Sequence, residues 1–423
     1  MEVLYPRCAG LDVHKKSVTA CVCISEDGKR PSKQIRSFST MLDGLQELAT
    51  WLTDNGVTHV AMEITGVYWK PIWNVLEGDF TLLLVNAHHI KTVPGRKTDV
   101  KDCEWIADLL RHGLLKGSFV PPQSQQDVRE LTRYRTSLLQ EKSAEVNRLQ
   151  KTLEGANIKL ASVASNVMGV SGREMLAALV AGTTDPAVLA ALARGKLREK
   201  MPELQRALAG RFRAHHRFLV AQQLAHIDDL DALIAQLDRE IAERLRPFED
   251  MIVRLDTIPG IGRRLAEILI AEIGVDMSRF PTAAHLASWA GMCPGNNESA
   301  GKRHSGKTRK GNRHLRAALT EAAQAAAHKK DSYLAAQARR LAARRGKKRA
   351  TLAVGHSILV IVYHVLAHAD STYRDLGHTY FDRRDSDALE RRLVRRLESL
   401  GNRVTVEKVV APEPAVASKG EAA

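Results

Sequence analysis

The chain has 423 residues and is expected to form two or three domains. Its 44% hydrophobic and 26% charged residues are ordinary for a soluble globular protein, and its longest apolar run, at 358–362, is too short to span a bilayer. The formal net charge of +15 indicates a polyanionic partner. The five cysteines lack the spacing of a zinc site, and the N-terminus has no signal-peptide pattern, so a cytoplasmic protein with reduced thiols is expected.

The first third of the chain predicts a mixed α/β domain. Apolar alternation and β-branched residues predict strands, and an apolar period of about 3.6 residues predicts helices. In chain order these are strands at 8–13, 17–24 and 34–39, a helix at 42–52, a strand at 59–64, a helix at 69–76, a strand at 80–85 and a helix that starts within 97–110. This β-β-β-α-β-α-β-α order is that of the ribonuclease H-like fold.

Four acids fall at related places in this order. Asp12 lies in the apolar first strand, Glu63 ends the fourth strand, and Asp99 and Asp102 open the helix after the fifth. Residues three apart share a helix face, and a buried strand acid without a cation is costly. Four carboxylates at the strand ends could hold two Mg²⁺ ions about 4 Å apart and clamp a phosphodiester.

Each acid also has a simpler interpretation. Asp99 and Asp102 form an acidic first turn, which the helix dipole favours. Asp12 could be a turn or cap acid, and Glu63 a solvated strand end. The joint pattern on this topology favours the metal site.

Three segments carry a family resemblance. Residues 10–15 (Gly-Leu-Asp-Val-His-Lys), 62–69 (Met-Glu-Ile-Thr-Gly-Val-Tyr-Trp) and 97–102 (Lys-Thr-Asp-Val-Lys-Asp) resemble the acidic motifs of DEDD transposases. These enzymes form the one-ten family of bacterial insertion sequences, whose N-terminal domain resembles the RuvC resolvase. The resemblance implies that Asp12, Glu63, Asp99 and Asp102 bind Mg²⁺, with Mn²⁺ as a substitute.

The middle of the chain predicts long helices. Val120-Pro121-Pro122 breaks the chain, helical patterns follow at 126–160 and 211–246, and turn-rich short helices lie between them. One interpretation is an antiparallel coiled-coil arm that also joins protomers into a dimer or tetramer. The alternative is a helical spacer packed within one protomer.

Residues 255–266 predict a helix-hairpin-helix-like turn. Gly260 and Gly262 allow close backbone approach, and the amides of the next helix, with Arg263 and Arg264, could hold a phosphate. Many tight helix–helix turns use the same residues without binding DNA.

A polar loop at 296–303 opens a strongly basic segment. Residues 301–350 hold 16 Lys and Arg against two acids. Cations around the loop are expected to contact nucleic-acid phosphates, the alternative being a solvated basic face. They are Lys302, Arg303, Lys307, Arg309, Lys310, Arg313 and Arg316.

This segment resembles the C-terminal domain of the same family, in which a serine before Gly-Lys-Arg is the nucleophile. Ser299 matches that serine, although Ala300 stands where glycine is more usual, and Ser305 is the alternative. A serine hydroxyl needs activation to attack, and a serine–phosphate linkage would conserve the phosphodiester energy for rejoining. The resemblance implies Mg²⁺-dependent strand exchange by a tetramer, guided by a bridge RNA that pairs with donor and target DNA.

The predicted domains are a RuvC-like metal-binding domain at 1–120, the helical arm at 121–249, a mainly α transposase domain at 250–380, and a basic helix with a disordered tail at 381–423. Further helices are predicted at 352–366 and 388–400. Three rival functions remain: a RuvC-like endonuclease that uses metal-activated water, a sugar-kinase-like phosphotransferase suggested by residues 10–15, and a non-enzymatic nucleic-acid scaffold.

Overall fold

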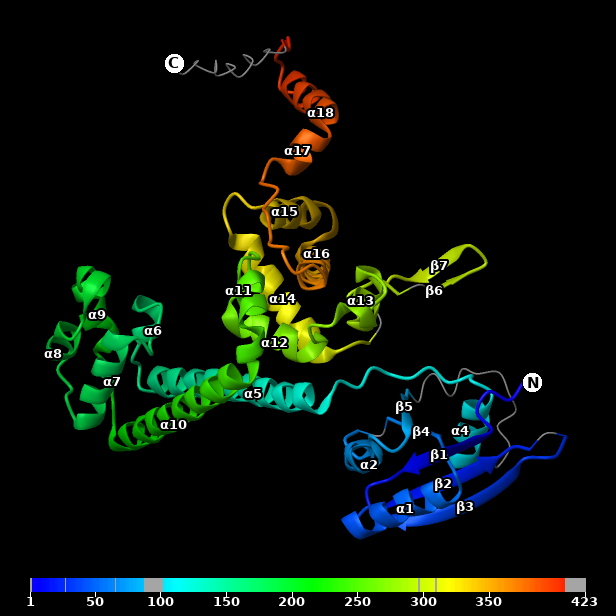
Figure 1. Cartoon of the computed structure of the whole chain (residues 1–423). Coiled ribbons are helices and arrows are strands. Elements are labelled where there is room, and N and C mark those ends of the chain that lie inside the picture. Colours follow the sequence, from blue (N-terminus) through cyan, green and yellow to red (C-terminus); the bar gives the residue numbers. More distant parts are fainter. Residues whose placement is uncertain are drawn as a thin grey trace, which may run out of the picture. The chain divides into compact units, whose positions relative to one another are not determined.

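The computed structural model describes residues 2–26, 28–64, 66–86, 102–295, 297–308 and 310–407, with only the backbone described at positions 297, 299 and 303. The chain divides into two compact units, Met1–Pro122 and Gln123–Ala423 (Figure 1). The predicted disordered tail lies mostly outside the described residues.

Unit 1 is built on a five-stranded sheet with the strand order β3-β2-β1-β4-β5. The first three strands pair antiparallel, whereas β1 pairs parallel with β4, and β4 with β5. The strands are β1 (Arg7–Val13), β2 (Ser17–Ile24), β3 (Ser32–Ser39), β4 (His59–Glu63) and β5 (Thr81–Val85). The helices are α1 (Leu42–Asp54), α2 (Trp69–Leu76) and α4 (Asp102–Arg111). Over the described residues of unit 1, the predicted order of elements is therefore confirmed.

The two faces of this sheet carry separate cores because side chains alternate along a strand. On one face, Leu11 and Met62 pack with residues of α1 and α2. On the other, Cys8 and Ala61 pack with residues of α4. Gly10 lies under α4, and a Cβ there would come within 2.3 Å of the Cys103 carbonyl oxygen. Only glycine therefore lets α4 lie this close to β1.

Unit 2 begins with a pair of long helices, α5 (Gln123–Gly155) and α10 (Ala214–Leu245). Ion pairs join Asp127 to Arg244 and Arg135 to Asp238, so the helices run antiparallel. The first helix ends five residues before the predicted end, and Asn157 then adopts a positive φ of 59°. Between the long helices, short ones form a lobe with its own core. They are α6 (Leu160–Val163), α7 (Val170–Ala181), α8 (Pro186–Ala191), η1 (Gly195–Lys200) and α9 (Met201–Leu208).

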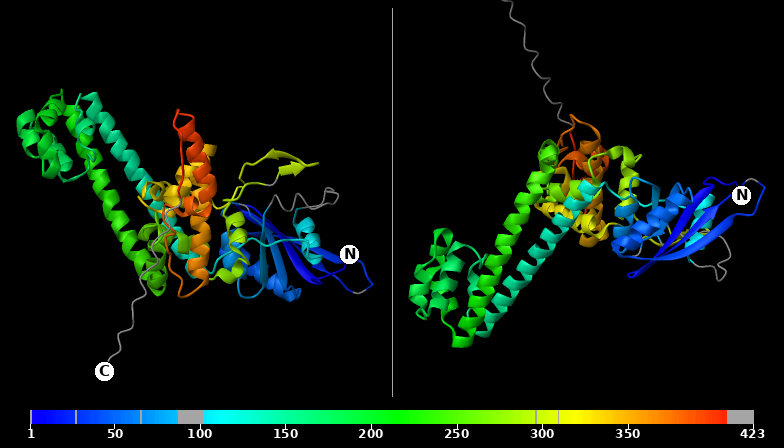
Figure 2. Two further views of the ribbon diagram at one scale, coloured as in Figure 1. Left: turned by 90° about the horizontal axis from the view of Figure 1, so that it is seen from above. Right: turned by 60° about the horizontal axis from the view of Figure 1, so that its bottom comes forward.

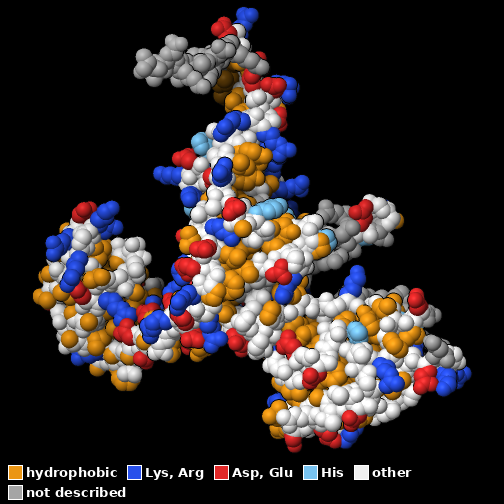
Figure 3. Space-filling model, viewed as in Figure 1, with side chains coloured by type: hydrophobic (Ala, Val, Ile, Leu, Met, Phe, Trp, Pro, Cys, Tyr) orange, Lys and Arg blue, Asp and Glu red, His pale blue; other side chains and the backbone are white. Residues whose placement is uncertain are grey.

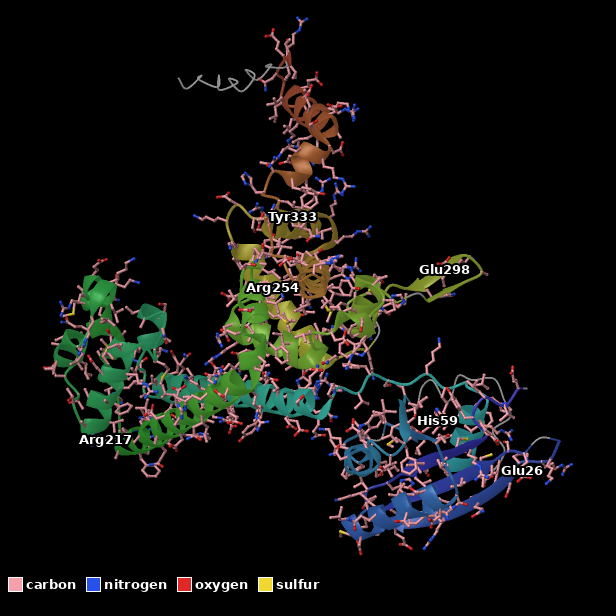
Figure 4. All side chains as sticks on the ribbon, viewed as in Figure 1. Glu26, His59, Arg217, Arg254, Glu298 and Tyr333 are labelled. Atoms are coloured by element: carbon pink, nitrogen blue, oxygen red, sulfur yellow. The ribbon has the colours of Figure 1, made fainter. Side chains whose placement is uncertain are left out.

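The rest of unit 2 is a helical body around one core. Its helices are α11 (Glu249–Asp256), α12 (Arg263–Ile273), α13 (Ala283–Trp289), α14 (Arg313–His328), α15 (Tyr333–Arg345) and α16 (Lys347–Ala367), with single turns η2 (Arg246–Phe248) and η3 (Met277–Arg279). Arg254, labelled in Figure 4, donates to the carbonyls of Val365 and His368 at 2.9 Å and so joins α11 to the end of α16.

Helix α16 is the one helix of the described residues that is long and apolar enough to cross a membrane. Within the helical body it packs against α11, α13, α14 and α15, and residues such as Val354, Ile358 and Val362 are fully buried. A core helix passes the same length and hydropathy test, so the finding is weak support for a membrane span. Beyond it lie α17 (Tyr380–Arg384) and α18 (Ser386–Glu398), the latter close to the predicted helix at 388–400.

The prediction of an irregular polar loop at 296–303 is wrong for the described residues. Residues Asn297–Ser299 form β6 and Lys302–Ser305 form β7, an antiparallel hairpin that projects from the helical body (Figure 2). Ala300 and Gly301 have φ values of 50° and 72°, as a two-residue hairpin turn requires. Polar residues on both faces of these short strands hide the alternation that would have predicted them.

Candidate functional site

Two of the predicted acids lie side by side near the C-terminal ends of two neighbouring inner strands of the unit 1 sheet. Strands β1 and β4 pair in parallel with Leu11 opposite Met62, and the next residues are Asp12 and Glu63. By the alternation of side chains, both acids belong to the sheet face that α4 covers. His14 Nε2 lies 3.2 Å from the Asp12 carboxylate.

A third acid comes to the same corner from α4, which begins at Asp102. The neighbouring residue, Cys103, touches β1 at Gly10. Asp12 lies two residues beyond Gly10 on the same face of β1, and its negative charge, together with burial, raises the pKa of the Cys103 thiol. Three elements therefore bring Asp12, Glu63 and Asp102 to one corner of unit 1.

The fourth predicted ligand, Asp99, lies outside the described residues. In the described part of the chain, no three His, Cys, Asp or Glu side chains gather closely enough to hold a metal ion. The three placed acids offer hard carboxylate oxygens, which fit a hard divalent cation. The complete metal site remains a prediction.

Ser299 lies beside the turn of the β6–β7 hairpin, where its Cα pairs with that of Lys302. The neighbouring Glu298 is exposed, and Figure 4 labels it on the projecting part of the hairpin. Lys302 and Lys307 are exposed as well. The sequence thus presents the predicted nucleophile on a projecting hairpin with cations on the returning strand.

The base of this hairpin is fixed to the helical body. The Gly295 amide donates to the Lys307 carbonyl at 3.0 Å. A Cβ at Gly311 would lie 2.4 Å from the Ala290 carbonyl carbon, so the returning segment passes tightly over the end of α13. The alternative nucleophile, Ser305, accepts a hydrogen bond from the Lys307 amide at 3.1 Å and so has a structural role in this turn.

The predicted helix-hairpin-helix turn joins α11 to α12, and its cations already have partners. Gly260 has a φ of 90°, and a Cβ there would come within 2.2 Å of the Ala322 carbonyl oxygen, so this glycine packs the turn onto α14. Gly262 is the N-cap of α12. Arg263 donates to the Glu249 carboxylate from both terminal guanidinium nitrogens and to Glu267 from Nε, while Arg264 donates to Asp238 at 2.6 Å. Phosphate binding by either arginine would have to compete with these carboxylates.

The remaining predicted cations follow the hairpin. Lys310 and Arg313 are exposed, and Arg316 is half-buried on α14. Arg309 lies outside the described residues, and the side chain of Arg303 is not described.

Sequence reasoning missed a buried ionic network at the base of the arm. Glu272 has no exposed surface and accepts two hydrogen bonds from Arg133, at 2.7 and 2.8 Å. Arg135, 1% exposed, donates to Glu267 at 2.6 Å. The signal was present as two acids within the apolar run of α12, which require buried cations.

Two family models match this chain, one over the segment that contains the predicted acids and one over the segment that contains the predicted serine. A transposase family model of the DEDD IS110 type matches residues 9–158, and one described as "Transposase IS116/IS110/IS902 family" matches residues 253–339. The first contains Asp12, Glu63, Asp99 and Asp102, and the second contains the β6–β7 hairpin.

Curated relatives have the same character. A "Probable family 20 transposase" of Pseudomonas aeruginosa is 27% identical over 270 residues, which are 63% of this chain and 70% of that protein. An IS116 insertion-element protein of Streptomyces clavuligerus is 29% identical over 245 residues, 50% of this chain and 60% of the relative. The "Pilin gene-inverting protein" of Moraxella lacunata is 41% identical over 69 residues, 16% of this chain and 21% of the relative.

The chain has an α/β unit that carries the acids, followed by a helical unit, and it matches both transposase family models. Together these features define an insertion-sequence transposase. Within that class, the chain belongs to the IS110 family.

Proposed function

We propose that the protein moves an insertion sequence by cutting and exchanging DNA strands through a covalent serine–DNA intermediate. The observation that carries the proposal is the presence, in one chain, of a DEDD transposase segment and a second transposase segment that contains Ser299. Acids alone would suit hydrolysis by water, whereas a serine linkage allows rejoining.

The metal-binding part is a ribonuclease H-like domain. Asp12, Glu63, Asp99 and Asp102 hold Mg²⁺, or Mn²⁺ in its place. The common corner of Asp12, Glu63 and Asp102 supports this assignment. When bound, the ions neutralise phosphate charge and stabilise the attacking and leaving oxygens.

The serine chemistry conserves the phosphodiester. Ser299 Oγ attacks a DNA phosphorus, the new O–P bond forms as the bond to the departing sugar oxygen breaks, and the serine proton ends on that oxygen. Attack by a sugar hydroxyl of another strand reverses the step, restores the serine and joins the strands without ATP. Lys302, beside Ser299 on the hairpin, supplies positive charge for the developing alkoxide.

One relative supports rejoining in particular. The Moraxella protein is named for inverting a pilin gene, and inversion requires that cut DNA ends be joined again. A protein that only hydrolysed DNA would leave the ends open.

The partners proposed are donor and target DNA, a structured bridge RNA, and further copies of this chain in a dimer or tetramer, in the cytoplasm. The family resemblance supports the RNA. Two neighbouring apolar side chains on α10, Phe218 and Leu219, are 65% and 45% exposed, which supports contact between copies through the arm.

The test is transposition in bacteria of a plasmid-borne copy of the element, with its non-coding ends, by the full-length protein. Ser299→Ala and Asp12→Asn are expected to abolish transposition, and Ser305→Ala, the matched control in the same hairpin, to retain it. If Ser299→Ala abolished strand joining but left Mg²⁺-dependent cleavage at the wild-type rate, the chain would be a water-using endonuclease. If Ser305→Ala alone were inactive, the nucleophile would be Ser305.

A further inference from the structure

A groove of 590 Å³ lies between α14, α15 and α16. Its floor is made of small side chains, among them Ala323, Ala327 and Ala338, and its rim carries cations from all three helices. The Lys and Arg side chains of the rim are Arg316, Arg339, Lys347 and Lys348. In Figure 3, Lys and Arg side chains gather around α15.

The charge of this groove is not compensated. Asp and Glu are missing from the described residues that line it, and its four Lys and Arg side chains make no ion pair within the described part of the chain. Arg263 and Arg264, by contrast, are neutralised by carboxylates. Positive charge without a carboxylate partner therefore lies at the groove, whereas the arginines of the turn between α11 and α12 are paired.

The start of α16 adds to this potential. Its first turn contains Lys347, Lys348 and Arg349 and no acid. The helix dipole disfavours cations at an N-terminus, so this turn is destabilised by its own sequence unless an anion binds there. Such a local conflict is typical of a functional surface.

The uncharged residues that line the groove indicate which class of ligand it binds. Gln324 offers amide donors of the kind that contact phosphate oxygens, whereas the hydroxyls of Thr320 and Thr351 already donate to the carbonyls of Arg316 and Lys347 within their own helices. The described lining has no Phe, Tyr or Trp side chain on which an unpaired base could stack, and its one ring is the smaller imidazole of His328, which favours a duplex whose bases remain stacked. The alanine floor lets a sugar–phosphate backbone approach closely.

We propose that the groove between α14, α15 and α16 binds the sugar–phosphate backbone of duplex DNA without reading its sequence. The proposal deepens the transposase function and rests on it for the choice of DNA. It adds Arg339, Lys347 and Lys348 as DNA contacts outside the hairpin and the turn between α11 and α12.

The test compares two pairs of consecutive lysines within the basic segment 301–350, one pair at the rim of the groove and one outside it. Lys347→Gln with Lys348→Gln removes two rim charges, and Lys329→Gln with Lys330→Gln removes two exposed charges that do not line the groove. Binding of a fluorescent duplex of arbitrary sequence is measured over a range of salt concentrations, with the full-length protein and no Mg²⁺. The rim variant is expected to bind about tenfold more weakly or worse, and its log–log salt slope to fall by about 1.8. The control pair is expected to match the wild type.

Equal losses in both variants, or no loss in the rim variant, would overturn the proposal. So would loss of single-stranded RNA or polyglutamate binding with duplex binding unchanged, because the groove would then hold another partner. The same titrations on Ser299→Ala keep the two proposals apart, since that variant lacks strand exchange but retains the groove. Thermal unfolding of each variant shows that a loss of binding is not a loss of fold.

Discussion

Asn312 and Glu272 join the start of α14 to the base of the arm: Asn312 Nδ2 lies 2.6 Å from the Glu272 carboxylate. The Oδ1 atom of the same asparagine caps α14 by accepting from the His314 and Leu315 amides at 3.0 and 3.2 Å. Glu272 is held in turn by Arg133 on α5. The segment that returns from the Ser299 hairpin is thus fastened to α12, α14 and α5 through one side chain.

Replacing Asn312 separates its two roles. Asn312→Asp keeps an oxygen that can cap α14 but loses the donor to Glu272 and sets two carboxylates against each other. Asn312→Ala loses both the cap, a cost of about 0.5–2 kcal/mol, and the donor to Glu272, but adds no charge. We expect Asn312→Asp to lower the free energy of unfolding in urea by more than Asn312→Ala does. The reverse order would show that the cap outweighs the repulsion between the two carboxylates.

The Glu272 network makes stability depend on pH. Burial opposes ionisation of Glu272, but the hydrogen bonds and positive charge of Arg133, with Arg129 and Asn312, outweigh it and hold its pKa below the ordinary value of 4.5. Because the pKa of Glu272 is lower in the folded than in the unfolded chain, its ionisation stabilises the fold fully at pH values above the pKa of the unfolded chain. This stabilisation is lost as the pH falls through the pKa of the folded chain.

Glu272→Gln is therefore expected to cost about 3 kcal/mol near pH 7, because it leaves the largely buried Arg129 and the half-buried Arg133 without their counter-charge. The difference between wild type and variant in the free energy of unfolding, measured in urea, should stay constant from pH 6 to 8 and shrink below pH 4.5. A gap that widened on acidification would show that Glu272 does not carry the charge of this network.

Ala300 occupies a turn position that favours glycine, with a φ of 50°. Ala300→Gly relieves the clash of Cβ with the backbone and is expected to stabilise the hairpin by about 0.5–1 kcal/mol. Gly301→Ala, the matched change at the next residue with a φ of 72°, is expected to destabilise it. Hydrogen exchange of the hairpin amides measures both, and opposite changes in protection are the expected result. Changes in the same direction would contradict this geometry.

The sheet and the acids of unit 1 were accessible to sequence reasoning because their signals are local. Alternation in β1 and β4 places Leu11 and Met62 on one face, and the strand order then brings Asp12 and Glu63 together. Nothing local could reveal the partners of Glu272, since Arg133 lies 139 positions away along the chain.

Long-range pairing also explains the uneven outcome for the basic residues. The sequence treats Arg264 and Arg316 alike as candidate phosphate ligands. Only the fold shows that Asp238, on a different helix, lies opposite Arg264, while Arg316 lines a groove without acids in its described lining. The +14 excess of residues 301–350 indicated the right segment but not which cations in it are free.

Metal binding at the acid corner should stabilise the fold. At about 100 times its dissociation constant, Mg²⁺ is expected to add ~2.7 kcal/mol to the free energy of unfolding. Asp12→Asn should remove most of this gain while raising stability without metal, because it relieves repulsion between carboxylates. Asp43→Asn, at an exposed acid of α1, is the control and should keep the full gain. Thermal unfolding with and without Mg²⁺ checks this, and equal gains in both variants would remove Asp12 from the site.

The most direct test of the account is to trap the full-length protein on DNA of its own element in the presence of Mg²⁺ and map the modified peptide by mass spectrometry. The account predicts a nucleotide linked through phosphate to Ser299, and its loss in Ser299→Ala. DNA strands cut and joined at the wild-type rate, without any residue of the chain becoming linked to them, would contradict it.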